Sequence, residues 1–88
     1  MAIKEQWIVY IIECRTSDLY VGVTKDIENR IKKHNNGIAC RYTKYRSPVK
    51  LIYTEKCENY NDARQKEWQI KKYSRKKKLD LLNKDLSP

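Results

Sequence analysis

Apolar residues gather in three short runs along the chain, and this pattern predicts three β-strands. The first run, residues 7–12, is apolar or aromatic throughout, as expected of a buried strand. The second covers residues 19–23, and the chain between the two has the composition of a hairpin turn, so these strands should lie side by side. The third run, residues 49–54, begins directly after Pro48.

Helical patterns follow the second and third of these strands. A first helix should begin after a cap at Thr24 or Asp26 and stop at Gly37, with acidic residues in its first turn and basic ones in its last. A second is expected from residue 61 or 62 to about 73, and Ser74 can cap a third. Three leucines of this third helix fall at helical spacing, namely Leu79, Leu82 and Leu86. The element order β-β-α-β-α-α indicates the α+β class.

The length of 88 residues corresponds to one small domain, which we expect to span residues 1–88 with a core at about 7–83. No run approaches the roughly 20 apolar residues of a membrane span. The first residues also lack the apolar centre of a signal peptide, so we expect a cytoplasmic protein with no membrane partner. We also expect this small domain to be a monomer.

The cysteines Cys14, Cys40 and Cys57 are odd in number and widely spaced. That spacing argues against a zinc knuckle or a disulfide framework. We therefore expect reduced thiols packed as small apolar side chains. A catalytic thiol partnered by His34 is the alternative.

The formal net charge of +9 is concentrated in two blocks, residues 41–46 and 71–78, which interleave Lys and Arg with Tyr. Cations neutralise phosphates and aromatic rings stack on bases or sugars, so the blocks favour binding of a polyanion. A merely solvated helix face is the alternative, and the blocks do not separate DNA from RNA. The candidate nucleic-acid-binding residues are Lys25, Arg41, Lys44, Arg46, Lys71, Lys72, Arg75, Lys76 and Lys77.

Two tyrosines, Tyr10 and Tyr20, lie ten residues apart in the first two strands. The chain has seven Tyr and no Phe, although Phe would pack without a hydroxyl that needs a partner. On adjacent strands, both hydroxyls could reach one face of one sheet.

Arg30 and His34 are i,i+4 neighbours on the first helix, at the predicted border between core and solvent. Taken alone, Arg30 is better explained by pairing with Asp26 or Glu28, and His34 by an interaction with the helix dipole.

Glu67 shares the inward face of the second helix with Ala63 and Ile70. A carboxylate on such a face is costly unless it is paired or binds a metal. A salt bridge to Arg30 and a single-carboxylate Mg²⁺ site are both consistent with this position.

Together these residues resemble the GIY-YIG nuclease superfamily. The resemblance rests on the motifs Val9-Tyr10-Ile11 and Tyr20-Val21-Gly22, with Gly22 as the motif glycine, followed by Arg30 and Glu67. Further matching positions are Thr24, His34, Asn35 and Gly37. It covers roughly residues 7–83 and is closest to small stand-alone bacterial members, which consist of this domain alone.

The resemblance implies a small three-stranded antiparallel sheet flanked by three helices. It also implies hydrolysis of nucleic-acid phosphodiesters, DNA above all, with Mg²⁺ or Mn²⁺. In this scheme Tyr10 or Tyr20 helps to activate water with His34 beside them, Arg30 stabilises the phosphate, and Glu67 holds the cation. Because free Tyr has a pKa near 10, a tyrosine base needs nearby positive charge, for which Arg30, His34, Lys25 and the metal are candidates.

Two positions depart from the family pattern. Val9 stands where the first motif has glycine, and the late family asparagine has only Asn83 nearby. Three functions therefore compete: an endonuclease selective for nucleic-acid shape and linked to repair or recombination, a DNA- or RNA-binding module that does not cut, and a protein that binds an acidic protein partner.

Overall fold

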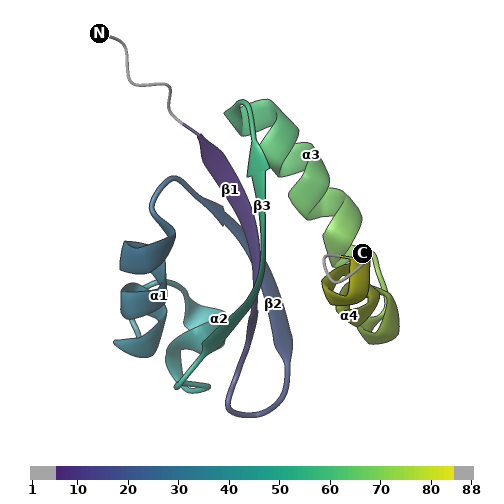
Figure 1. Ribbon diagram of the computed structural model, residues 1–88. Coiled ribbons are helices and arrows are strands. Elements are labelled where there is room, and N and C mark those ends of the chain that lie inside the picture. Colours follow the sequence, from purple (N-terminus) through teal and green to yellow (C-terminus); the bar gives the residue numbers. More distant parts are fainter. Residues whose placement is uncertain (1–5, 85–88) are drawn as a thin grey trace, which may run out of the picture.

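The computed structural model describes residues 6–84 and has the predicted α+β architecture (Figure 1). Strands β1 (Trp7–Glu13), β2 (Leu19–Thr24) and β3 (Lys50–Cys57) form one antiparallel sheet in the order β2-β1-β3. The expected strands are thus confirmed, and β3 extends three residues beyond its predicted end. β2 is an edge strand, so its outer side is open to groups arriving from either face.

Helices α1 (Ile27–Asn35), α3 (Tyr60–Lys71) and α4 (Arg75–Lys84) are the three that the sequence predicts. The Asp26 side chain caps α1, as expected, by accepting from the Asn29 amide. Gly37 follows α1 with a φ of 76°, the left-handed conformation that ends many helices. α3 begins slightly earlier than predicted because the Asn59 side chain accepts from the Asp62 amide and so caps it.

A fourth, one-turn helix, α2 (Arg41–Lys44), lies in the first basic block, where we expected no helix. Its N-cap, Cys40, makes no side-chain capping bond. The signals that mark the longer helices are therefore missing from this turn, which is why the sequence did not reveal it.

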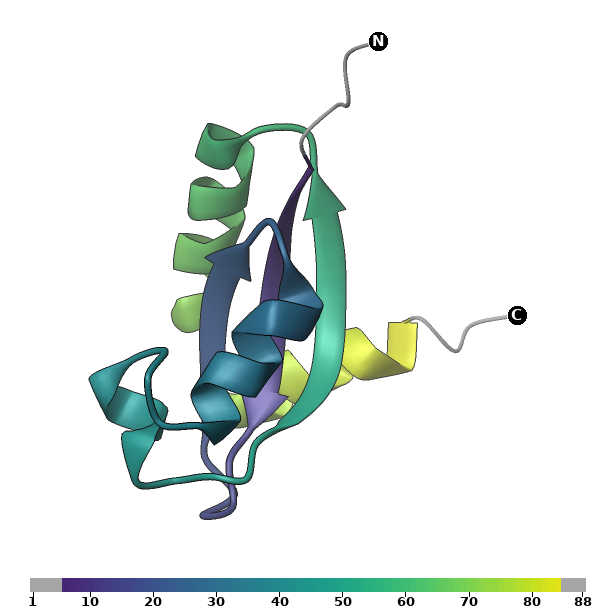
Figure 2. The same ribbon diagram turned by 90° about the vertical axis from the view of Figure 1, so that its left-hand side faces the viewer.

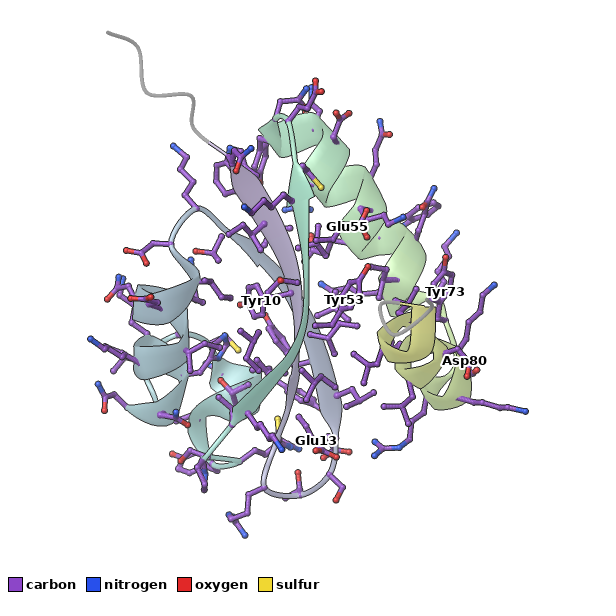
Figure 3. All side chains as sticks on the ribbon, in the orientation of Figure 1. Tyr10, Glu13, Tyr53, Glu55, Tyr73 and Asp80 are labelled. Carbon is purple, nitrogen blue, oxygen red and sulfur yellow. The ribbon has the colours of Figure 1, made fainter. Side chains whose placement is uncertain are left out.

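The helices lie on both faces of the sheet, α1 and α2 on one and α3 and α4 on the other (Figures 1 and 2). Side chains alternate along β1, so the two faces have separate cores. The α1 face buries Tyr10, Ile12, Cys14 and Val49, and the α3 face buries Val9, Ile11, Val21, Ala63 and Ile70. Figure 3 shows Tyr10 on the α1 side and Tyr53 on the opposite side.

The structure also bears on the predictions made for the leucines of α4, for the cysteines and for membrane spans. Leu81 packs against the α3-face core, Leu79 and Leu82 are half-buried, and Leu86 lies outside the described residues. The three cysteines are free thiols, as expected. Among residues 6–84, no helix is both long enough and apolar enough to cross a bilayer.

Candidate active site

The Tyr10 side chain lies across Gly22, its partner on the neighbouring strand, and is only 2% exposed. A Cβ atom added at Gly22 would stand 2.5 Å from the Tyr10 hydroxyl oxygen and 2.6 Å from its Cζ. The absence of a side chain at this motif position is therefore what allows the ring to lie there. From it, the Tyr10 hydroxyl reaches Nε2 of His34 at 2.9 Å.

Gly22→Ala is expected to push the Tyr10 ring off this position. Overpacking of this kind costs about 1–3 kcal/mol of stability, and displacement of the hydroxyl should also break its hydrogen bond to His34. Chemical denaturation and the Tyr10–His34 signals in NMR measure both effects. Gly37→Ala, which strains a backbone at φ 76° but meets no atom of Tyr10, is the control. A Gly22→Ala protein with an unperturbed Tyr10 would contradict this explanation.

His34 is more deeply placed than the sequence suggested, with 1% of its surface exposed. Its ring bonds Tyr10 through Nε2 and the Thr43 hydroxyl through Nδ1, the latter at 2.7 Å. Burial, with the nearby Arg30 charge, lowers the pKa of His34 to about 4. The ring is therefore neutral at pH 7, and the expectation that it supplies positive charge to a tyrosine base is wrong.

The Tyr20 ring is half-buried on the same face as Tyr10. It stacks on Tyr42 with 5.7 Å between ring centroids and meets the edge of His34 at 5.4 Å. The sequence prediction that both phenols share one face is thus confirmed. Burial raises the pKa of each phenol, to about 12 for Tyr10, where the Arg30 charge acts in the opposite direction.

Arg30 and Glu67 reach the tyrosines electrostatically from different sides of the sheet. Arg30 comes from α1, while Glu67 comes from α3, which packs on β1 and β2. The Arg30 charge lowers the pKa of Tyr10 and the Glu67 charge raises the pKa of both Tyr10 and Tyr20, and in each case burial is the larger effect.

Glu67 is 8% exposed, as its predicted inward position requires. Its ion pairs within the described chain are to Arg64 at 3.3 Å and Lys71 at 3.0 Å, both on its own helix. The alternative of a salt bridge to Arg30 is therefore wrong.

Glu67 is also the candidate metal ligand. No group of three or more His, Cys, Asp and Glu side chains in residues 6–84 could enclose a metal ion. A single carboxylate nevertheless fits Mg²⁺, which keeps most of its waters and takes one or two carboxylates together with substrate phosphate. The side chain of Asn83 lies outside the described residues, so the late family asparagine has no placement here.

The nine candidate basic residues differ in how far the fold already engages them. Arg46 lies 3.5 Å from Asp18 and 4.3 Å from the Tyr42 ring, while Arg75 pairs with Glu13 at 3.6 Å. The other seven are exposed, namely Lys25, Arg41, Lys44, Lys71, Lys72, Lys76 and Lys77. Several of them also have partners within the fold: Lys71 pairs with Glu67, and four others lie over aromatic rings, namely Lys25, Lys44, Lys72 and Lys77. Their contacts with nucleic acid stay predictions.

Sequence reasoning missed three residues that contact the tyrosine–histidine cluster from α2 and its cap: Cys40, Tyr42 and Thr43. From the sequence, Tyr42 and Thr43 are interpreted only as part of a basic, tyrosine-containing block that binds nucleic acid, and Cys40 as a packed thiol. Thr43, with none of its surface exposed, binds His34, and Tyr42 stacks on Tyr20. Nothing in local spacing marks them, because the contacts depend on how α2 folds back beside α1.

Comparison with known proteins identifies the family of this chain. The family model described as the GIY-YIG catalytic domain matches residues 6–80. A UPF0213 protein of Staphylococcus saprophyticus is 48% identical over 75 residues, which cover 85% of this chain and 92% of that protein. A UPF0213 protein of Clostridium perfringens is also 48% identical over 75 residues, covering 85% of this chain and 81% of its own.

A solved structure is similar as well. The solution NMR structure of a UPF0213 protein from Bacillus halodurans is 37% identical and has a TM-score of 0.57, covering 89% of this chain and 83% of that one. These names state no activity. The family match spans both tyrosine motifs, Arg30 and Glu67, so the chain belongs to the GIY-YIG family of nuclease catalytic domains.

Proposed function

We propose that this protein is a Mg²⁺-dependent endonuclease that hydrolyses phosphodiester bonds in nucleic acid, with DNA as the expected substrate. One observation supports the proposal: the charges of a guanidinium, Arg30, and of an inward carboxylate, Glu67, both act on the buried phenol of Tyr10, although the three side chains come from separate elements. Such a combination suits phosphate chemistry, which needs cationic and metal stabilisation of the phosphate and an ordered water.

In this proposal Arg30 binds the phosphate directly, and Glu67 binds the cation that contacts it. The planar guanidinium of Arg30 can grip two phosphate oxygens at once. Glu67 would hold the cation with one carboxylate oxygen, while Arg64 and Lys71 keep that carboxylate oriented. When bound, Mg²⁺ would lower the pKa of water and polarise the scissile phosphate.

The two phenols keep their protons near neutral pH, because burial raises the pKa of both. In this proposal they orient the attacking water by hydrogen bonding, and either could take its proton only when phosphate and cation are bound. We further propose that the substrate is recognised by shape, such as a branch, nick or end, because a domain this small has little surface for reading a long sequence.

A module that binds nucleic acid without cutting it is the second candidate. The ion pairs of Glu67 favour it, since they already satisfy the carboxylate without a metal. This alternative predicts affinity that falls steeply with salt and survives Glu67→Ala. A protein that instead binds an acidic partner would show no nucleic-acid binding at low salt.

The decisive experiment is a cleavage panel of branched, nicked, single-stranded and double-stranded substrates, DNA and RNA, with Mg²⁺, Mn²⁺ or a chelator. We expect metal-dependent cuts in at least one DNA substrate and none with the chelator. Binding without cleavage of any substrate would contradict the endonuclease proposal and support the second candidate, a module that binds nucleic acid without cutting it. Absence of both would leave the protein-binding alternative.

A further inference from the structure

A chain of polar contacts leads from Tyr10 through His34 to α2 and its cap. The Tyr10 hydroxyl meets His34 Nε2 at 2.9 Å, and His34 Nδ1 meets Thr43 Oγ1 at 2.7 Å. Thr43 Oγ1 lies 3.4 Å from the sulfur of Cys40. The first three of these side chains are at most 2% exposed, so bulk water does not compete for their protons.

A neutral imidazole has one N–H, so His34 donates through one ring nitrogen and accepts through the other. Which nitrogen carries the proton decides the role of Tyr10. With the proton on Nε2, the ring donates to the Tyr10 oxygen and would stabilise negative charge there. With the proton on Nδ1, Nε2 instead accepts a hydrogen bond from the Tyr10 hydroxyl.

The Thr43 hydroxyl has two polar neighbours, His34 Nδ1 at 2.7 Å and the Cys40 sulfur at 3.4 Å, and either atom of the Thr43–Cys40 contact can donate. Sulfur is a weak acceptor, whereas an unprotonated imidazole nitrogen is a good one. The Thr43 hydroxyl proton is therefore better placed on His34 Nδ1 than on the sulfur, and the thiol can then donate to Thr43 Oγ1.

We propose that Thr43 is a positioning residue that donates its hydroxyl proton to His34 Nδ1 and so holds the ring as the tautomer with its N–H aimed at Tyr10. Thr43 would influence Tyr10 through His34, since the side-chain contacts of Thr43 among residues 6–84 are with the His34 ring and with Cys40. The effect of this tautomer on the cleavage rate rests on the proposed endonuclease function. The tautomer itself does not depend on that function. The site is therefore incomplete without α2, whose other cluster contact, Tyr42, packs on Tyr20.

The tautomer can be observed directly, because His34 is the one histidine of the chain. Protein labelled with ¹⁵N-histidine should show, at pH 7, a single neutral ring protonated at Nε2. Thr43→Val removes the hydroxyl and should convert this pattern into a mixture of tautomers, while Thr43→Ser should restore it. Thr54→Val, at an exposed threonine on β3 opposite Tyr10, is the matched control and should change nothing.

A wild-type ring protonated at Nδ1, or a Thr43→Val spectrum identical to wild type, would overturn the proposal. The wild-type spectrum decides the tautomer even where Thr43→Val does not fold. In the cleavage assay, Thr43→Val should lower kcat by about 10²-fold with KM unchanged, as for a misplaced catalytic group, and Thr43→Ser should recover most of it. If the wild type cuts nothing, the endonuclease proposal fails while the tautomer result still stands.

Discussion

Glu67→Gln is expected to abolish metal-dependent cleavage while leaving the fold and nucleic-acid binding in place. Glutamine keeps the shape of the side chain but removes the charge that would hold the cation. Loss of the metal's charge stabilisation, on the order of 4 kcal/mol, corresponds to at least about a 10³-fold lower rate. Single-turnover cleavage with saturating protein measures this loss separately from binding.

The fold should survive because the partners of Glu67 are exposed. The side chains of Arg64 and Lys71 are 58% and 51% exposed, and ion pairs to such groups contribute no more than about 1 kcal/mol each. Glu55→Gln is the matched control, since Glu55 also pairs with a lysine of α3, Lys66, at 3.5 Å. If the Glu67→Gln protein cuts at the wild-type rate, Glu67 serves the stability of α3 alone.

Tyr10→Phe should lower the cleavage rate by roughly 10²–10⁴-fold, the usual contribution of a positioned acid or base. The ring can still lie across Gly22, so the change removes the hydroxyl and its bond to His34 Nε2 and little else. The stability cost of one lost hydrogen bond is about 1 kcal/mol. Thermal melts and single-turnover rates give the two effects in parallel.

Two companion variants make the Tyr10 result specific. Tyr53→Phe also removes a hydroxyl, one bonded to Glu55 at 2.7 Å on the opposite face, and should leave the rate unchanged. Tyr20→Phe shows which phenol acts on water, because the larger loss identifies it. An unchanged rate in Tyr10→Phe would exclude Tyr10 from the chemistry and reduce its role to packing beside His34.

Much of the site was predictable because it depends on local periodicity. The two-residue repeat of a strand puts Tyr20 and Gly22 on one face, and the hairpin aligns Gly22 with Tyr10. The helical repeat puts Glu67 inward with Ala63 and Ile70. With Arg30, these positions carried the resemblance to the GIY-YIG family, and the family model matches the segment that contains them, residues 6–80.

The sequence by itself determined the strands, the long helices, the shared face of the tyrosines and the inward carboxylate, since each follows from spacing within one element or one hairpin. Only the tertiary structure decided the burial of His34 and its contacts with Tyr10 and Thr43. Tyr10 and His34 are 24 residues apart, and α2 carries no capping signal. Such contacts arise from how separate elements pack, and no periodicity along the chain encodes them.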